Sequence, residues 1–180
     1  MLTISERLKT INRDLLRRLR PVELGRISLK ELIESLLSGF ERRHPEVEFN
    51  FTPGRLERSY GETTDLTIFR CVQEALTNAM RHGNAKRVAI ELGEQSTPSQ
   101  GNGRSSARKL GLVVQDDGEG FAPDAPIGLG LTAMQERVRT IDGTSLIQSS
   151  PQGGTTIVVR VPLAPDGVRP PHQSLTSQSA

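Results

Sequence analysis

Three short polar segments of the chain carry side chains that could do chemistry. In the first, Glu74, Asn78 and either Arg81 or His82 follow one another at spacings of four, three and four residues. On a helix these spacings bring an acid, an amide and a cation onto one face. A row of this kind is more often a solvated helix face than a site, so it needs support from the rest of the chain.

The other two polar segments are rich in glycine. Asp116-Asp-Gly-Glu-Gly120 follows a predicted strand, and its glycines permit a tight turn and a close approach of the backbone to a ligand. Gly128-Leu-Gly-Leu131 opens a predicted helix, where free N–H groups and the positive end of the helix dipole suit a phosphate. Neither segment fits the dinucleotide fingerprint or the Walker pattern. Each is weak evidence alone, and their order along the chain indicates a site.

Hydrophobic periodicity predicts the elements that must position these segments. Apolar residues at helical spacing predict helices over residues 2–20, 28–40, 62–81 and 129–141. Apolar residues at alternate positions predict strands over residues 47–51, 88–92, 110–114, 144–150 and 155–161. A capping-box signature, Ser28 with Glu31, begins the second helix. Paired strands with helices grouped between them indicate an α+β fold, in which helices cover one face of a mixed sheet.

Three stretches do not read as part of this core. Residues 2–20 carry a heptad-like apolar stripe that requires a partner helix. Residues 93–109 are dominated by Gly, Ser, Gln, Asn and Pro, which predicts a long, poorly ordered loop. Residues 165–180 have almost no apolar side chains, which predicts a disordered tail.

The composition bounds the class of protein. A length of 180 residues predicts one domain with appendages. The single cysteine, Cys71, excludes a disulfide framework and multi-cysteine metal sites and fits a reducing compartment, with the cytoplasm as the default. No apolar run of the sequence approaches the ~18 residues of a membrane span. A formal net charge of +2 and few aromatic residues argue against nucleic-acid binding.

Three longer motifs contain the polar segments. They are Gln73-Glu-Ala-Leu-Thr-Asn-Ala-Met-Arg-His-Gly-Asn-Ala85, Asp116-Asp-Gly-Glu-Gly-Phe121 and Gly128-Leu-Gly-Leu-Thr-Ala-Met-Gln-Glu-Arg137. They resemble the N, G1 and G2 boxes of the ATP-binding domain of sensor histidine kinases. That superfamily also includes type II topoisomerases, MutL-type mismatch-repair proteins and ninety-kilodalton heat-shock chaperones. The resemblance spans about residues 28–163. It implies a two-layer sandwich of the Bergerat type, with helices on one face of a mixed, mainly antiparallel sheet.

The end of the third motif resembles one subfamily in particular. Its Met-x-Glu-Arg ending is typical of sensor kinases that pair with response regulators of the NarL type. That subfamily also has a very short ATP lid, and only residues 122–128 separate Phe121 from Leu129. The two observations agree.

The resemblance implies a role for each polar side chain. Asn78 would complete the coordination of Mg²⁺ through its side-chain oxygen, since a hard cation prefers oxygen ligands. Arg81 and His82 would face the triphosphate of ATP. Asp116 would accept a hydrogen bond from the adenine amino group, a contact that guanine could not make. Glu74 matches the general base or orienting group for the attacking nucleophile.

The resemblance also assigns contacts to glycines, a leucine and a threonine. Gly118 and Gly120 would let the backbone lie against the base and ribose. Gly128, Gly130 and Leu131 lie where backbone N–H groups would bind the phosphates. Thr155, in the Gly-Thr pair before the last strand, would support the adenine or its carboxylate partner through its hydroxyl.

The same resemblance implies a longer parent protein. A histidine kinase needs a phosphoacceptor histidine on a dimerising helix, and none of His44, His82 and His172 lies in such a context. We therefore expect this chain not to phosphorylate itself. We expect three parts: the end of a dimerisation helix with a linker (1–25), an ATP-binding catalytic domain (26–164) and a tail (165–180). The homodimeric parent, anchored in the inner membrane or not, would phosphorylate its own histidine. A response regulator would then take the phosphoryl group.

Two other interpretations stay open. An anti-sigma-type serine protein kinase of the same superfamily has the same boxes and needs no acceptor histidine. The Met-x-Glu-Arg ending and the basic N-terminal helix argue against it. A non-catalytic interaction module with a vestigial pocket is the other interpretation, and the intact Asn78, Asp116 and glycines argue against such decay.

Overall fold

The computed structural model describes residues 27–56, 59–97, 107–122 and 124–163. The helices of this part are α2 (Leu29–Glu41), α3 (Glu62–Arg81) and α4 (Leu129–Arg139). Its strands are β1 (Glu48–Pro53), β2 (Arg87–Thr97), β3 (Ala107–Asp116), β4 (Thr144–Ser149) and β5 (Thr155–Pro162). The expected helix over 2–20 and the expected tail lie outside the described residues.

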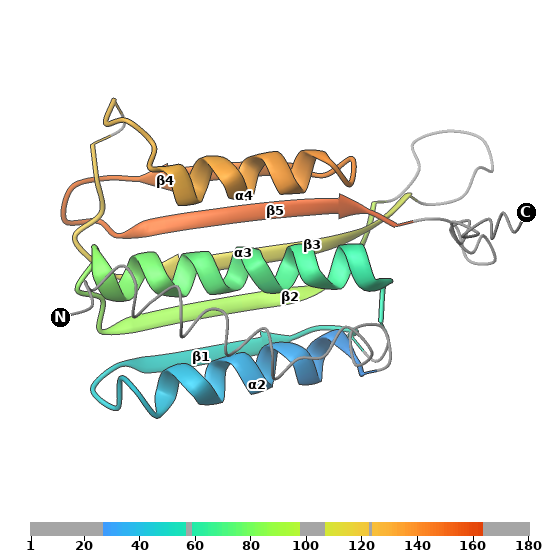
Figure 1. Cartoon of the computed structure of the whole chain (residues 1–180), viewed down its shortest axis with the longest axis horizontal. Coiled ribbons are helices and arrows are strands. Elements are labelled where there is room, and N and C mark those ends of the chain that lie inside the picture. The colour runs from blue at the N-terminus through green and yellow to red at the C-terminus, as the bar shows by residue number, and fades with distance from the viewer. Residues whose placement is uncertain (1–26, 57–58, 98–106, 123, 164–180) are drawn as a thin grey trace, which may run out of the picture.

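The five strands form one sheet in the order β1-β2-β3-β5-β4. β1 runs parallel to β2, and the other neighbouring pairs are antiparallel. Figure 1 shows α2, α3 and α4 side by side against one face of the sheet. The predicted α+β sandwich is therefore confirmed, and β3 and β5 become direct neighbours although α4 and β4 separate them in the sequence.

Local signals define α2. The Ser28 side chain accepts a hydrogen bond from the Glu31 N–H at 3.2 Å, and the Ser28 N–H donates to Glu31 Oε2 at 2.9 Å. This capping box satisfies two backbone donors that the first turn would otherwise leave free. The apolar side of the helix is buried: Leu29, Leu32, Ile33, Leu36, Leu37 and Phe40. Capping and periodicity thus agree, as predicted.

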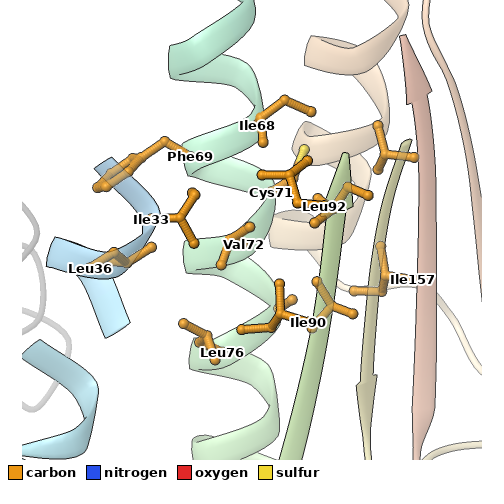
Figure 2. Close-up of a cluster of buried hydrophobic side chains, with 14 of the residues drawn as sticks. Ile33, Leu36, Ile68, Phe69, Cys71, Val72, Leu76, Ile90, Leu92 and Ile157 are labelled. Atoms are coloured by element: carbon orange, nitrogen blue, oxygen red, sulfur yellow. The ribbon is translucent and has the colours of Figure 1, made fainter. Parts of the chain in front are cut away.

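The core lies between the helices and the sheet, with α3 at its centre. Figure 2 shows Ile33 of α2, Val72 of α3 and Ile90 of β2 among the clustered side chains. Leu76 is fully buried and Leu92 almost so. Apolar burial stabilises by roughly 25 cal/mol per Å². This layer holds α3, and with it the first polar segment, in a fixed position on the sheet.

The predicted loop over 93–109 is wrong at both ends. β2 continues to Thr97 and β3 begins at Ala107, so strand pairing extends into the region that lacks apolar periodicity. The reason is tertiary: Gly93 lies opposite Gly111 in the β2–β3 ladder, and the Glu94 carboxylate pairs with Arg108. Polar residues therefore form strand here because their backbones pair with a partner strand. Residues 98–106 lie outside the described part.

The observed bounds of the helices agree closely with those predicted from the sequence. α3 has the predicted bounds, and α4 ends two residues before the predicted Ile141. Among the described residues, no helix combines the length and apolar character that a membrane span requires.

Candidate functional site

A cavity of about 1190 Å³ lies between the C-terminal half of α3 and the start of α4. Residues 120–121 and 125–128 and the adjoining ends of β3 and β5 complete its walls. Its volume suits a ligand of nucleotide size. Nearly all of the residues singled out in the sequence line it: Glu74, Asn78, Arg81, His82, Asp116, Gly120, Gly128, Gly130, Leu131 and Thr155. The three polar segments therefore meet at one site.

Asp116 provides a hydrogen-bond acceptor at one end of the cavity. Its Oδ1 accepts from the Gly118 N–H at 3.0 Å and from the Thr155 N–H at 3.3 Å. Oδ2 has no hydrogen-bond partner among the described residues. Burial raises the pKa of this half-buried carboxyl, although both hydrogen bonds act in the opposite direction. The free oxygen can therefore accept a hydrogen bond from an N–H of a ligand.

Thr155 supports Asp116 in a different way from that expected. The contact comes from its backbone N–H, whereas its hydroxyl lies 3.0 Å from the Ser149 Oγ. The backbone contact arises because Asp116 and Thr155 are partners in the β3–β5 ladder. The hydroxyl still lines the cavity wall with the rest of Thr155.

Asn78 provides an amide at another part of the cavity. Its Nδ2 is buried and has no hydrogen-bond partner among the described residues. A buried polar atom without a partner costs roughly 1–3 kcal/mol, so this group is suited to a ligand. Asn78 as a whole is half-buried and lines the cavity, and its Oδ1 is the atom that a hard cation would use. Arg81 and His82 lie exposed on the same cavity wall.

The described residues contain no cluster of three or more His, Cys, Asp or Glu side chains that could hold a metal by themselves. Mg²⁺ does not require one, because it commonly binds through one or two protein oxygens together with substrate phosphates and water. The single amide of Asn78, in a cavity that Arg81 and His82 also line, fits that mode of binding.

The start of α4 provides free backbone donors. Gly128 is the N-cap residue and makes no side-chain capping bond, so the first-turn N–H groups of Leu129, Gly130 and Leu131 have no intrahelical partner. These N–H groups and the helix dipole favour an anion at this edge of the cavity.

Glu74 contacts the first turn of α4. A Cβ atom at Gly130 would overlap the Glu74 carboxylate, so the glycine leaves the space that this side chain occupies. Glu74 thereby reaches the cavity beside the free N–H groups of α4. An acid, an amide and an anion-binding helix end are thus combined in one cavity.

Comparison with known proteins agrees with this geometry. The model of the histidine kinase-, DNA gyrase B- and HSP90-like ATPase family matches residues 63–165. The chain belongs to this ATPase family. The matched residues run from the first turn of α3 through β5 and include every residue of the site named above.

Sensor kinases are among the curated relatives of this ATPase domain. Sensor histidine kinase LiaS of Bacillus subtilis is 34% identical over 157 residues, which cover 86% of this chain and 39% of that protein. The signal transduction histidine-protein kinase/phosphatase UhpB of Salmonella typhimurium is 34% identical over 151 residues, which cover 83% of this chain and 28% of that protein. The chain thus spans well under half the length of these relatives.

A solved structure has the same fold as this ATPase domain. The histidine kinase domain of the blue-light activated histidine kinase EL346 from Erythrobacter litoralis matches with a TM-score of 0.58 at 21% identity. The match covers 77% of this chain and 63% of that one. The solved structure shares the fold, and the family match places this chain among the ATPase domains that its histidine kinase relatives also contain.

Gly118 does not line the cavity of the ATPase domain, in contrast to its expected place against the base and ribose. A Cβ atom at Gly118 would overlap the backbone of Gly83, and the neighbouring Glu119 N–H donates to the Gly83 carbonyl at 2.7 Å. Gly118 therefore lets the turn after β3 pack on the end of α3. Asp117 strengthens the same junction, because its Oδ1 accepts from the N–H groups of Lys86 and Arg87, each at 2.8 Å.

Several lining residues of the ATPase domain escaped the sequence analysis. Arg43 and His44 follow α2 and reach the cavity with Phe40, and Arg43 lies over the Phe40 ring at 4.6 Å. The run of basic residues after an apolar helix was an available signal for them. Ile127 also lines the cavity and is 45% exposed, and no periodic pattern in the sequence marks it.

Proposed function

We propose that this domain binds Mg·ATP and supplies the γ-phosphoryl group for phosphorylation of a histidine outside this chain. The observation that carries the proposal is that Asp116 and Asn78 open onto one cavity. The acceptor of Asp116 suits the base of a nucleotide, and the Asn78 amide beside Arg81 suits its phosphates. Mg²⁺, when bound, would neutralise phosphate charge and hold the phosphates in line for transfer.

Asp116 selects the base in this proposal. An ionised carboxylate can only accept, so it pairs with the amino group of adenine and repels the carbonyl of guanine. The N–H groups of Gly118 and Thr155 hold Oδ1 in place and leave Oδ2 for the base.

The other residues act on the triphosphate. Asn78 holds the metal through Oδ1. Arg81 and His82 face the phosphates, and the free N–H groups at the start of α4 bind phosphate oxygens. Preorganised donors of this kind stabilise charge that develops during transfer.

Glu74 orients the attacking nucleophile. In the transfer, an imidazole nitrogen of the acceptor histidine forms a bond to the γ-phosphorus while the bond from phosphorus to the bridging oxygen of ADP breaks. A carboxylate at Glu74 would hydrogen-bond the other imidazole nitrogen and align the ring. Positioning and charge neutralisation dominate this chemistry, so loss of Glu74 should harm the reaction less than loss of Asn78.

The proposal extends to the parent protein. The relatives are named as sensor histidine kinases, which favours a histidine acceptor over the serine acceptor of an anti-sigma-type kinase. The Met-x-Glu-Arg ending supports a NarL-type response regulator as the onward partner. A homodimeric parent would bring the acceptor helix to this cavity, on the cytoplasmic side where ATP is available.

Titration calorimetry of the 180-residue chain with ATP, with and without Mg²⁺, tests the proposal. Wild-type protein should bind ATP more tightly when Mg²⁺ is present. Asn78→Ala should lose this Mg²⁺ dependence and at least about tenfold in affinity, because the metal loses its protein ligand. Its thermal stability without nucleotide should not fall, because the change removes a buried unpaired amide.

Asn50→Ala is the matched control. Asn50 lies exposed on β1, outside the residues that line the cavity, and its side chain donates a hydrogen bond to Glu48. This variant should bind as the wild type does. Equal Mg·ATP binding by Asn78→Ala and Asn50→Ala would contradict the proposed site.

A further inference from the structure

Ser149, the last residue of β4, joins three segments around the end of the cavity where Asp116 lies. Its Oγ accepts a hydrogen bond from the Phe121 N–H at 2.9 Å. The same oxygen lies 2.9 Å from the carbonyl oxygen of Gly154 and 3.0 Å from Thr155 Oγ1. Thr155 lines the cavity, whereas Ser149 is not among the residues that line it. None of the family motifs in the sequence includes Ser149.

The partners of Ser149 determine where its proton lies. A hydroxyl has one proton to donate and two lone pairs to accept. The Gly154 carbonyl can only accept, so the Ser149 proton lies on that contact. The Phe121 N–H occupies one lone pair, which leaves the other for Thr155 Oγ1.

The same count of donors and acceptors determines the direction in which the Thr155 hydroxyl proton points. If Thr155 did not donate to Ser149, two oxygen lone pairs would face each other at 3.0 Å and repel. The Thr155 hydroxyl is therefore the donor in this contact, and its own lone pairs remain free. Only this arrangement makes all three contacts of Ser149 attractive.

We infer that Ser149 fixes the proton of Thr155 and thereby makes Thr155 a hydrogen-bond acceptor toward the ligand. Asp116, the ladder partner of Thr155, is an acceptor as well. The base-binding end of the cavity then presents acceptors from two neighbouring side chains. Ser149 is a positioning residue, since it acts through Thr155 and does not line the cavity itself.

This inference rests on the proposed function and refines its specificity. A 6-amino purine donates a hydrogen bond at the position where a 6-oxo purine accepts one. Two fixed acceptors therefore favour ATP over ITP, whether the contact is direct or runs through an ordered water. If Ser149 lost its hydroxyl, Thr155 could rotate and donate to a 6-oxo group, and the preference would weaken.

Dissociation constants for Mg·ATP and Mg·ITP, measured by calorimetry on the 180-residue chain, test the inference. In Ser149→Ala the preference for ATP over ITP should fall about tenfold, the effect of one hydrogen bond. Ser149→Thr, which keeps a hydroxyl, should restore the wild-type ratio. Ser149→Cys, a weaker donor and acceptor, should also lower the ratio and replaces the alanine variant if that variant is unfolded.

Two controls separate the hydroxyl contact from a general effect on the turn. Ser150→Ala makes the same change at the next residue, whose hydroxyl makes no hydrogen bond among the described residues, and should leave the ratio unchanged. In a Thr155→Val background, Ser149→Ala should no longer change the ratio, because the hydroxyl that it orients is absent.

An ATP-over-ITP ratio that stays unchanged in folded Ser149→Ala would overturn the inference. An equal change in the Thr155→Val background would also overturn it, because Ser149 would then act through the backbone of the turn. Failure of the wild-type chain to bind ATP at all would instead contradict the proposed function, so the two failures are distinguishable.

Discussion

At the scale of single residues, the cavity contains groups that the folded chain leaves unsatisfied. Asn78 Nδ2 is buried without a partner, and the Asp116 carboxyl has a pKa raised by burial. Both features oppose folding of the empty domain. A ligand that donates to the Asp116 carboxylate and accepts from the Asn78 amide would relieve both. Perturbed groups of this kind gather at functional sites because ligand contacts compensate them.

The raised pKa of Asp116 predicts a pH dependence of base binding. An N–H donor from adenine stabilises the ionised carboxylate, so binding of adenosine should weaken as the pH falls through the pKa of Asp116, which lies above 3.8. Adenosine is the probe because it carries no phosphate. Calorimetry across this pH range should show the loss, and Asp116→Asn should bind weakly at every pH. Adenosine affinity that stays constant over the range would contradict the role of Asp116.

At the scale of elements, the site depends on how closely α3 approaches α4. Glu74 on α3 occupies the space above Gly130 on α4, where any larger residue would displace the carboxylate. A glycine near the start of a helix weakens that helix by up to about 1 kcal/mol relative to alanine. Gly130 therefore makes α4 less stable than alanine would, and it leaves the space that holds the Glu74 carboxylate at the cavity.

A double-mutant cycle on Glu74 and Gly130 tests this contact. Gly130→Ala should be more favourable for stability in a Glu74→Ala background than in the wild type, by about 0.5 kcal/mol or more, because no carboxylate has to move. Urea unfolding measures both differences. Gly128→Ala is the control, since a Cβ atom there meets nothing within 4 Å. A Gly130→Ala effect that is equal in the two backgrounds would show that the two residues do not interact.

At the scale of the whole molecule, one hydrophobic layer holds α3 and the sheet, which form much of the cavity wall. α3 contributes Glu74 and Asn78 to the cavity. Its buried apolar side chains pack between α2 and the sheet (Figure 2). The sheet in turn brings Asp116 of β3 beside Thr155 of β5. Substitutions that weaken this hydrophobic layer should therefore impair the site by unfolding the domain.

Leu76→Ala should destabilise the domain by about 2–5 kcal/mol, because Leu76 is fully buried in this layer and the change leaves a cavity. Leu146→Ala removes the same atoms from a side chain that is 50% exposed and should cost about 1 kcal/mol or less. Denaturant unfolding monitored by circular dichroism provides both values. Similar losses for the two variants would contradict the assignment of Leu76 to the core.

The sequence by itself determined the elements whose patterns are local. Apolar spacing predicted α3 with its observed bounds, and Ser28 with Glu31 predicted the start of α2, because periodicity and capping act within a few residues. The polar motifs likewise contained most of the residues that line the cavity. This was possible because residues on one helix face, or at the end of one strand, recur at a regular spacing that can be recognised in the sequence.

Only the tertiary structure decided the features that depend on distant partners. The ends of β2 and β3 are polar, and they form strand because each pairs with the other across a segment that shows no periodicity. Gly118 packs on Gly83, and Ser149 contacts Phe121, through contacts for which the sequence has no local signal. The physical reason is that a hydrogen bond between segments far apart depends on where the fold places them, and spacing along one segment carries no information about the other.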